Sequence, residues 1–209
     1  MNFISLSKEG YECLEKLYDK IIFLLCKETE NFKFIGLREE IIVELDNDIN
    51  RIKVKMKEKG MVLKDVVDIK AIREFQQRYN VMLPEELVLF YTTISNGCEM
   101  IDGFPLRAFE DWKYNHELIF KEFPFAKYYI WEDETDETFD IKTIDYGNIE
   151  LIDIGCGQTW NIIVCGKEYG KMWNCTDVGI APAAPELSFL EWFEFWLDGG
   201  EDYFKEFEM

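Results

Sequence analysis

The stretch NIELIDIGCGQTWNIIVCGKEYGKMWN, residues 148–174, decides the fold. Its runs 148–154, 159–165 and 171–174 are rich in β-branched and aromatic residues, and glycine-containing turns at 155–158 and 166–170 separate them. Short strands joined by such turns form hairpins. The stretch therefore predicts an antiparallel meander, and similar β-forming residues make 104–109 and 127–131 further strand candidates.

Helical patterns flank these strands. Apolar residues recur every three or four positions in 8–28, 37–59 and 69–79, which predicts amphipathic helices. The run 51–59, RIKVKMKEK, also alternates as a strand does, so it could instead pair in a sheet. Pro84 opens a predicted helix over 84–95 that Asn96-Gly97 closes. Ser188 and Glu191 have the spacing of a capping box and begin a predicted helix over 188–198.

The helical and strand patterns are segregated along the 209 residues, which is typical of an α+β protein. We expect a central antiparallel sheet flanked by helices in a domain of residues 66–209, preceded by an N-terminal helical segment, residues 1–65. The chain can bury a core of its own, because 48% of its residues are hydrophobic. Neither a metal nor a disulfide is needed for folding, and we expect no cofactor.

The charge of the chain is uneven. Residues 1–80 contain 15 Lys+Arg and 15 Asp+Glu, whereas residues 81–209 contain 8 and 27, which accounts for the whole net charge of −19. Such a field repels nucleic acids and anionic membranes and accelerates encounter with a cationic protein. A solvated surface that only aids solubility is the alternative.

The N-terminal residues lack the apolar core of a signal peptide, and no run approaches the length of a membrane span. We therefore expect a cytoplasmic protein with reduced cysteines. The six cysteines form no CxxC pair, and the interpretation favoured for Cys156 and Cys165 is that of small buried side chains. The sole histidine, His116, is predicted to lie in a surface loop, and Gly155-Cys156-Gly157 lacks a partner for an exposed nucleophile. These observations favour a protein that is not an enzyme.

The stretch WEDETDETFD, residues 131–140, is the candidate partner-binding site. Its carboxylates do not have the spacing of an EF-hand, so we weigh a solvated acidic loop, a protein-docking loop and a calcium site against one another. The docking interpretation assigns partner contacts to Trp131, Glu132, Asp133, Glu134, Asp136, Glu137 and Asp140. In the aromatic helix 188–198 most rings should be buried, and any ring left exposed beside acidic side chains could anchor a partner.

Five features in order resemble the Smi/Knr-type domain of the SUKH superfamily over residues 69–204. These are Leu83-Pro84 opening a helix, Asn96-Gly97 ending it, Gly155-Cys156-Gly157 leading into strands, Trp173 on a strand, and Ser188-Phe189 at the last helix. The N-terminal 65 or so residues depart from the family pattern, and no family role can be carried to them.

The resemblance implies an α+β domain without known catalytic residues, and an immunity protein that neutralises a toxin, often a nuclease, from competing cells. Fold similarity does not settle function. It does agree with the charge, because a nuclease surface is cationic and an acidic inhibitor can cover it. The alternatives are a regulatory scaffold protein with an endogenous partner, and a calcium-binding or enzymatic protein that uses residues 132–140. The sequence leaves the partner's identity and the oligomeric state open.

Overall fold

The computed structural model describes the backbone of residues 32–100, 103–131, 140–200 and 203–204, and the side chains of those residues from 45 to 200. The chain divides into two compact units, Met1–Asn47 and Asp48–Met209. Of the first unit, the structure describes the beginning of helix α2, Phe32–Glu58. The helix predicted over 8–28 lies outside the described residues.

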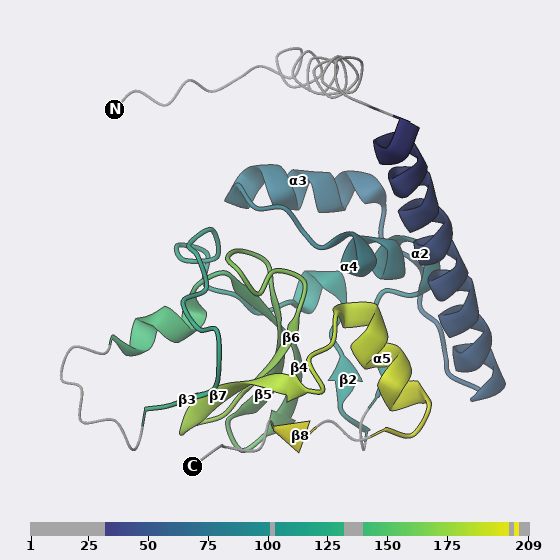
Figure 1. Cartoon of the computed structure of the whole chain (residues 1–209). Helices are drawn as coiled ribbons and strands as arrows, with labels where there is room; N and C mark the ends of the chain where they lie inside the picture. The colour runs from purple at the N-terminus through teal and green to yellow at the C-terminus, as the bar shows by residue number, and fades with distance from the viewer. Residues whose placement is uncertain (1–31, 101–102, 132–139, 201–202, 205–209) are drawn as a thin grey trace. The chain divides into compact units, whose positions relative to one another are not determined.

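The second unit is the predicted α+β fold with an antiparallel sheet (Figure 1). The sheet order is β3-β7-β6-β5-β4, and β8 also pairs with β7. The strands are β3 (Tyr129–Ile130), β4 (Asn148–Gly155), β5 (Gln158–Ile163), β6 (Met172–Cys175), β7 (Gly179–Ala184) and β8 (Tyr203–Phe204). β4 to β7 form a meander in chain order, so the central prediction is confirmed.

Strand β7 was not predicted, because its sequence GIAPAA combines small residues with a proline. The strand forms through pairing with β6, where Trp173 lies opposite Pro182. On its other side β7 pairs with β3 at 179–180 and with β8 at 183–184. Pro182 has no backbone N–H to donate, and it lies between the residues of β7 that pair with β3 and those that pair with β8. The proline therefore interrupts neither pairing.

A small hairpin of β1 (Cys98–Glu99) and β2 (Pro105–Leu106) precedes the main sheet. The strand predicted over 104–109 is therefore paired for only two residues. Gly97 has a φ of 76° and begins the turn into this hairpin. A Cβ at this position would lie 2.4 Å from the carbonyl oxygen of Leu106, so both the backbone conformation and the close approach require glycine.

Helix α3, Ile69–Tyr79, has the predicted bounds. Asp68 caps its first turn by accepting from the Lys70 N–H at 2.9 Å, and Asn80 ends it with a φ of 51°. The helix predicted over 84–95 is an α-helix, α4 (Glu85–Leu89), followed by a π-helical turn, η1 (Phe90–Ile94).

Helix α5 spans Phe189–Leu197 and begins as predicted after Ser188. The Glu191 carboxylate accepts from the Ser188 N–H at 2.9 Å. A second carboxylate reaches the same end, because Glu86 of α4 accepts from the Leu190 N–H at 2.9 Å. Two acceptors thus satisfy backbone donors that a helix N-terminus leaves unpaired.

Residues 51–58 are helical, so the strand that was the alternative for 51–59 does not form. Ile52 and Met56 lie one turn apart and are fully buried. On one face of the sheet, the Trp160 ring of β5 lies 5.4 Å from the Trp192 ring of α5. Side chains from the other face form a smaller core of Phe123, Ile163, Trp173 and Ile180.

Candidate partner-binding surface

The predicted site begins and ends on described residues, Trp131 and Asp140. Glu132, Asp133, Glu134, Asp136 and Glu137, which lie between them, fall outside the described residues. We call residues 132–139 the acidic segment. The structure places the two residues that flank it, Trp131 and Asp140.

Trp131 holds the first end of the acidic segment against the sheet. Its backbone N–H donates to the Val178 carbonyl at 3.0 Å, and its indole Nε1–H donates to the Asp177 carbonyl at 2.7 Å. The ring packs against the small core that contains Trp173. Trp131 is half-buried, because part of its side chain packs on the sheet. Its contact with a partner stays a prediction.

Asp140 holds the other end. Its carboxylate accepts from the Lys142 N–H at 3.1 Å and caps a 3₁₀ helix, η4 (Ile141–Asp145). The amide of Asn148, at the start of β4, donates to the Ile144 carbonyl at 2.7 Å and joins this helix to the sheet. Asp140 is exposed, although one carboxylate oxygen is used within the chain.

Two further carboxylates on β4 are partly neutralised. Glu150 and Asp153 pair across the strands with Asn161 and Thr159 of β5. Arg107 forms an ion pair with Glu150 and lies 3.5 Å from Asp153. Because a paired carboxylate already has its counter-charge, Glu150 contributes less to an external cationic partner than an unpaired carboxylate does.

His116 is exposed, as predicted, and it joins an aromatic group. Its Nδ1 lies 2.9 Å from the Tyr79 hydroxyl, and its ring centroid lies 4.6 Å from that of Tyr114. Burial and the neighbouring Tyr79 raise the pKa of Tyr114. These contacts hold the imidazole against the rings of Tyr79 and Tyr114.

The cysteines correct one prediction. Cys156 is exposed at the β4–β5 turn with a φ of 52°, and Cys165 is half-buried, so neither is the buried side chain that was predicted. The turn requires a left-handed backbone at 155–157, which places Cys156 at its tip. Of the four cysteines in the described part of the chain, Cys98 is the one classed as buried, and burial raises the pKa of its thiol to about 12.

Within the described part of the chain, no group of three or more His, Cys, Asp and Glu side chains could hold a metal ion. The acidic segment, on which the calcium alternative depends, lies outside the described residues. Among the described helices, none is long and apolar enough to cross a membrane.

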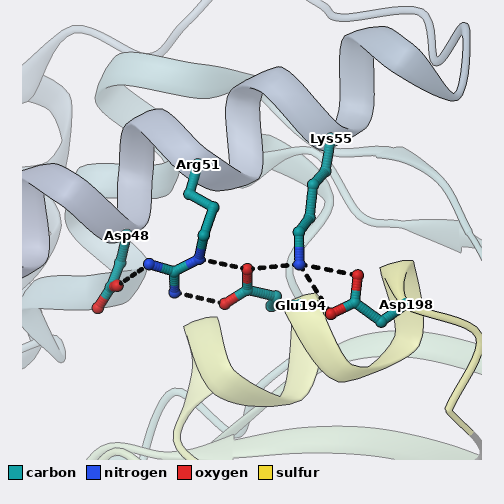
Figure 2. A network of polar contacts seen from close by, with 5 residues as sticks. All are labelled: Asp48, Arg51, Lys55, Glu194 and Asp198. Carbon is teal, nitrogen blue, oxygen red and sulfur yellow. Dashed lines mark hydrogen bonds and ion pairs between the residues drawn. The ribbon is translucent and has the colours of Figure 1, made fainter.

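A network of five charged residues joins α2 to α5 within the second unit (Figure 2). Arg51 contacts Asp48 at 2.7 Å and Glu194 at 2.5 Å. Lys55 contacts Glu194 at 2.8 Å and Asp198 at 2.7 Å. Arg51 and Lys55 are four residues apart on α2, and Glu194 and Asp198 are four residues apart in and just after α5. This spacing places each pair on one side of its helix, and it is the feature of the sequence that could have indicated the network.

The second unit also has a hollow with a volume of about 390 Å³. We call it the Trp196 hollow, and its lining is Lys59, Gly60, Met61, Val62, Glu99, Met100, Gly103 and Trp196. Phe189, Trp192 and Phe193 of the aromatic helix are buried, as predicted, whereas Phe195 and Trp196 are half-buried. Trp196 is thus a ring of the kind that the sequence suggested as an anchor.

The fold and these surfaces define an α+β domain with a largely acidic C-terminal region and an acidic segment held to the sheet at both ends. Comparison with known proteins gives no match to a family model, a curated protein or a solved structure.

Proposed function

We propose that this protein is a non-catalytic, acidic protein-binding domain of the Smi/Knr type that acts in the cytoplasm as an immunity protein and neutralises a basic toxin such as a nuclease. The observation that carries the proposal is the charge distribution: residues 81–209 hold 27 Asp+Glu against 8 Lys+Arg. A cationic active-site face is attracted to such a surface from a distance, which raises the association rate.

The positions of the family-like features support the proposed family. Leu83-Pro84 immediately precedes α4, and Asn96-Gly97 follows η1. The Gly155 to Gly157 turn joins β4 to β5, Trp173 lies on β6, and Ser188-Phe189 begins α5. Each feature therefore occupies the kind of element that the resemblance implies.

The anchoring of the acidic segment supports its role as the contact region. The chain enters it at Trp131, which is bonded to the residues before β7, and leaves it at Asp140, just before β4. Both ends are fixed on the domain, so a partner that binds the segment is held at one place on the sheet. The complementary charge of the segment mainly raises the association rate, and buried anchor residues set the lifetime of the complex.

The test is capture of the products of neighbouring open reading frames by the purified protein, with mass spectrometry at low and high salt. We expect a basic, nuclease-like chain whose retention falls as salt rises, and whose activity the protein inhibits. Capture of endogenous housekeeping proteins alone would favour the regulatory scaffold. Saturable calcium binding that raises the melting temperature would favour the calcium-binding alternative.

A matched pair of variants locates the contact. One variant neutralises Glu132, Asp133, Glu134, Asp136, Glu137 and Asp140 to the corresponding amides. The control neutralises six exposed carboxylates elsewhere, Glu58, Asp65, Glu85, Asp111, Glu117 and Glu122. Both changes alter the net charge equally, so we expect a much larger loss of affinity in the first. Equal losses would show that the total charge, and not this segment, governs binding.

A further inference from the structure

The 3₁₀ helix η4 has no buried side chain of its own. Most helices in proteins are stabilised by packing an apolar face on the core, so η4 depends instead on polar contacts. Its position bears on the proposed contact region, because its first turn directs Asp140. The Asp140 carboxylate accepts from the Lys142 N–H at 3.1 Å, and the Asp140 backbone carbonyl accepts from the Thr143 N–H at 2.9 Å.

Asn148, at the start of β4, bonds to the end of η4. Its Nδ2 donates to the Ile144 carbonyl at 2.7 Å and to the Tyr146 carbonyl at 3.0 Å. A backbone carbonyl can only accept, so these two bonds require the NH₂ group of Asn148 to face η4 and its Oδ1 to face away. Asn148 is only 6% exposed, so water cannot readily replace a lost bond, and leaving one unmade is costly.

Among the described residues, two other side chains bond to this region, both from the segment between β2 and β3. Asn115 donates to the Asp145 carboxylate at 3.2 Å, and the Lys121 Nζ lies 3.3 Å from the Tyr146 hydroxyl. The first bond is exposed, where water competes with it, and the second holds Tyr146 and not η4 itself. Asn148 is therefore the buried side chain that holds η4.

Asn161, on the neighbouring strand β5, orients Asn148. Its Nδ2 donates to the Asn148 Oδ1 at 2.8 Å, and its own Oδ1 accepts from the Thr159 hydroxyl at 2.8 Å. Asn161 is 7% exposed. The bonds all run in one direction, from Thr159 through Asn161 and Asn148 to η4, and hydrogen bonds aligned in this way polarise one another. Within the described chain, the side chain of Asn161 reaches η4 only through Asn148.

We infer that Asn161 and Asn148 form a buried amide relay that positions η4, and with it Asp140, on the sheet. Asn148 holds η4 directly, whereas Asn161 acts by fixing the orientation of the Asn148 amide. Without Asn161, the Asn148 Oδ1 loses its buried donor, and the amide is free to rotate away from the carbonyls of η4. The consequence for binding at Asp140 rests on the proposed function, but the attachment of η4 does not.

Asn174 offers a matched control. It is a fully buried amide on β6, and it belongs to the same sheet. Its Nδ2 donates to the Thr159 carbonyl at 3.1 Å, and its Oδ1 accepts from the Gln158 amide at 3.2 Å. These bonds stay within the sheet and do not lead to η4. Asn161→Ala and Asn174→Ala thus each remove a buried amide, and a difference between them at η4 reports the relay and not a general loss of stability.

Hydrogen exchange of the full chain, followed over residues 142–146, tests the relay. Asn148→Ala and Asn161→Ala should each accelerate exchange there at least ~5-fold, whereas Asn174→Ala should leave it within ~2-fold of the wild type. Thr159→Val removes only the hydroxyl that begins the relay and should accelerate exchange ~3-fold. An Asn161→Ala effect at 142–146 no larger than that of Asn174→Ala overturns the relay. If Asn161→Ala does not fold, unchanged exchange in Thr159→Val overturns it.

The basic chain captured in the test of the proposed function is the probe for the role in binding. Asp140→Asn and Asn161→Ala should each lower its affinity, and the double variant should match the larger single loss within ~2-fold, because Asn161 acts through the position of Asp140. Additive losses would overturn the positioning role, as would an equal loss in Asn174→Ala. Failure to capture a basic chain would contradict the proposed function, and the exchange measurement would still decide the attachment of η4.

Discussion

Replacing Glu194 with glutamine should destabilise the second unit in a pH-dependent way. Hydrogen bonds from Arg51, and then from Lys55, stabilise the charged carboxylate of Glu194, whereas burial disfavours it. The hydrogen bonds have the larger effect, so the pKa of Glu194 is lowered from 4.5 to about 2. A tenfold change in a protonation equilibrium is worth about 1.4 kcal/mol, so this lowering corresponds to at most about 3.4 kcal/mol at neutral pH. Arg51 is half-exposed, and solvent screening reduces the expected contribution to about 1–2 kcal/mol.

The sign of the pH dependence follows from the lowered pKa. A carboxylate whose pKa is lower in the folded protein stabilises it fully above the unfolded value of 4.5, and the contribution disappears as pH falls towards 2. Glu194→Gln should therefore lose about 1–2 kcal/mol at pH 7 and progressively less below pH 5. The difference should also shrink at high salt.

Urea unfolding of the wild type and Glu194→Gln at pH 7, 5 and 3.5 measures the loss. Glu117→Gln is the control, because Glu117 is an exposed glutamate whose side chain has no ion pair within the described chain. The reasoning is refuted if Glu194→Gln is as stable as this control at pH 7. A loss that is the same at pH 3.5 as at pH 7 would also refute it, because it would then arise from packing and not from charge.

Three further changes test other contacts. Gly97→Ala should destabilise the fold by more than about 2 kcal/mol, because its Cβ would meet the Leu106 carbonyl. Gly103 also has a positive φ but lies in open space, so Gly103→Ala should cost about 1 kcal/mol. Thermal unfolding of the two variants measures the difference. Trp131→Phe removes the indole N–H bond to the Asp177 carbonyl and should cost about 1 kcal/mol in urea unfolding, and no loss would show that this bond does not hold the segment. Burial raises the pKa of Glu86, so its charged form is costly to bury. Glu86→Gln keeps an oxygen for the Leu190 N–H and should leave the free energy of unfolding at pH 7 unchanged or raise it by up to about 1 kcal/mol. A clear loss of stability in urea unfolding would contradict this reasoning.

Local patterns predicted the elements whose own residues determine them. Helix α3 has its predicted bounds because Asp68 and Asn80 stop it at both ends, and Ile72 and Phe75 face the core. The meander from β4 to β6 follows from its glycine turns. Strand β7 depends on pairing with β6 on one side and with two short strands on the other, and no property of GIAPAA itself indicates this.

The candidate site was predictable in composition but not in geometry. The density of carboxylates between Trp131 and Asp140 is visible in the sequence, whereas the bond from the Trp131 indole to Asp177 joins residues 46 positions apart. The α2–α5 network joins residues 143 positions apart in the same way. Contacts between residues so far apart in the sequence form only when the tertiary fold has formed. A local pattern can therefore indicate which residue types take part, but not which residues contact one another.

Carboxylates that form ion pairs within this protein have a different role from carboxylates that do not. Among the basic residues of 51–59, Arg51 and Lys55 form ion pairs with Glu194 and Asp198 and hold α2 on α5. Carboxylates used in this way add little to the external field, because their counter-charge is adjacent. The field that attracts a cationic partner must therefore come from carboxylates without such neighbours. For this reason, removing an α5 carboxylate should alter stability more than partner affinity, and neutralising 132–140 should do the opposite.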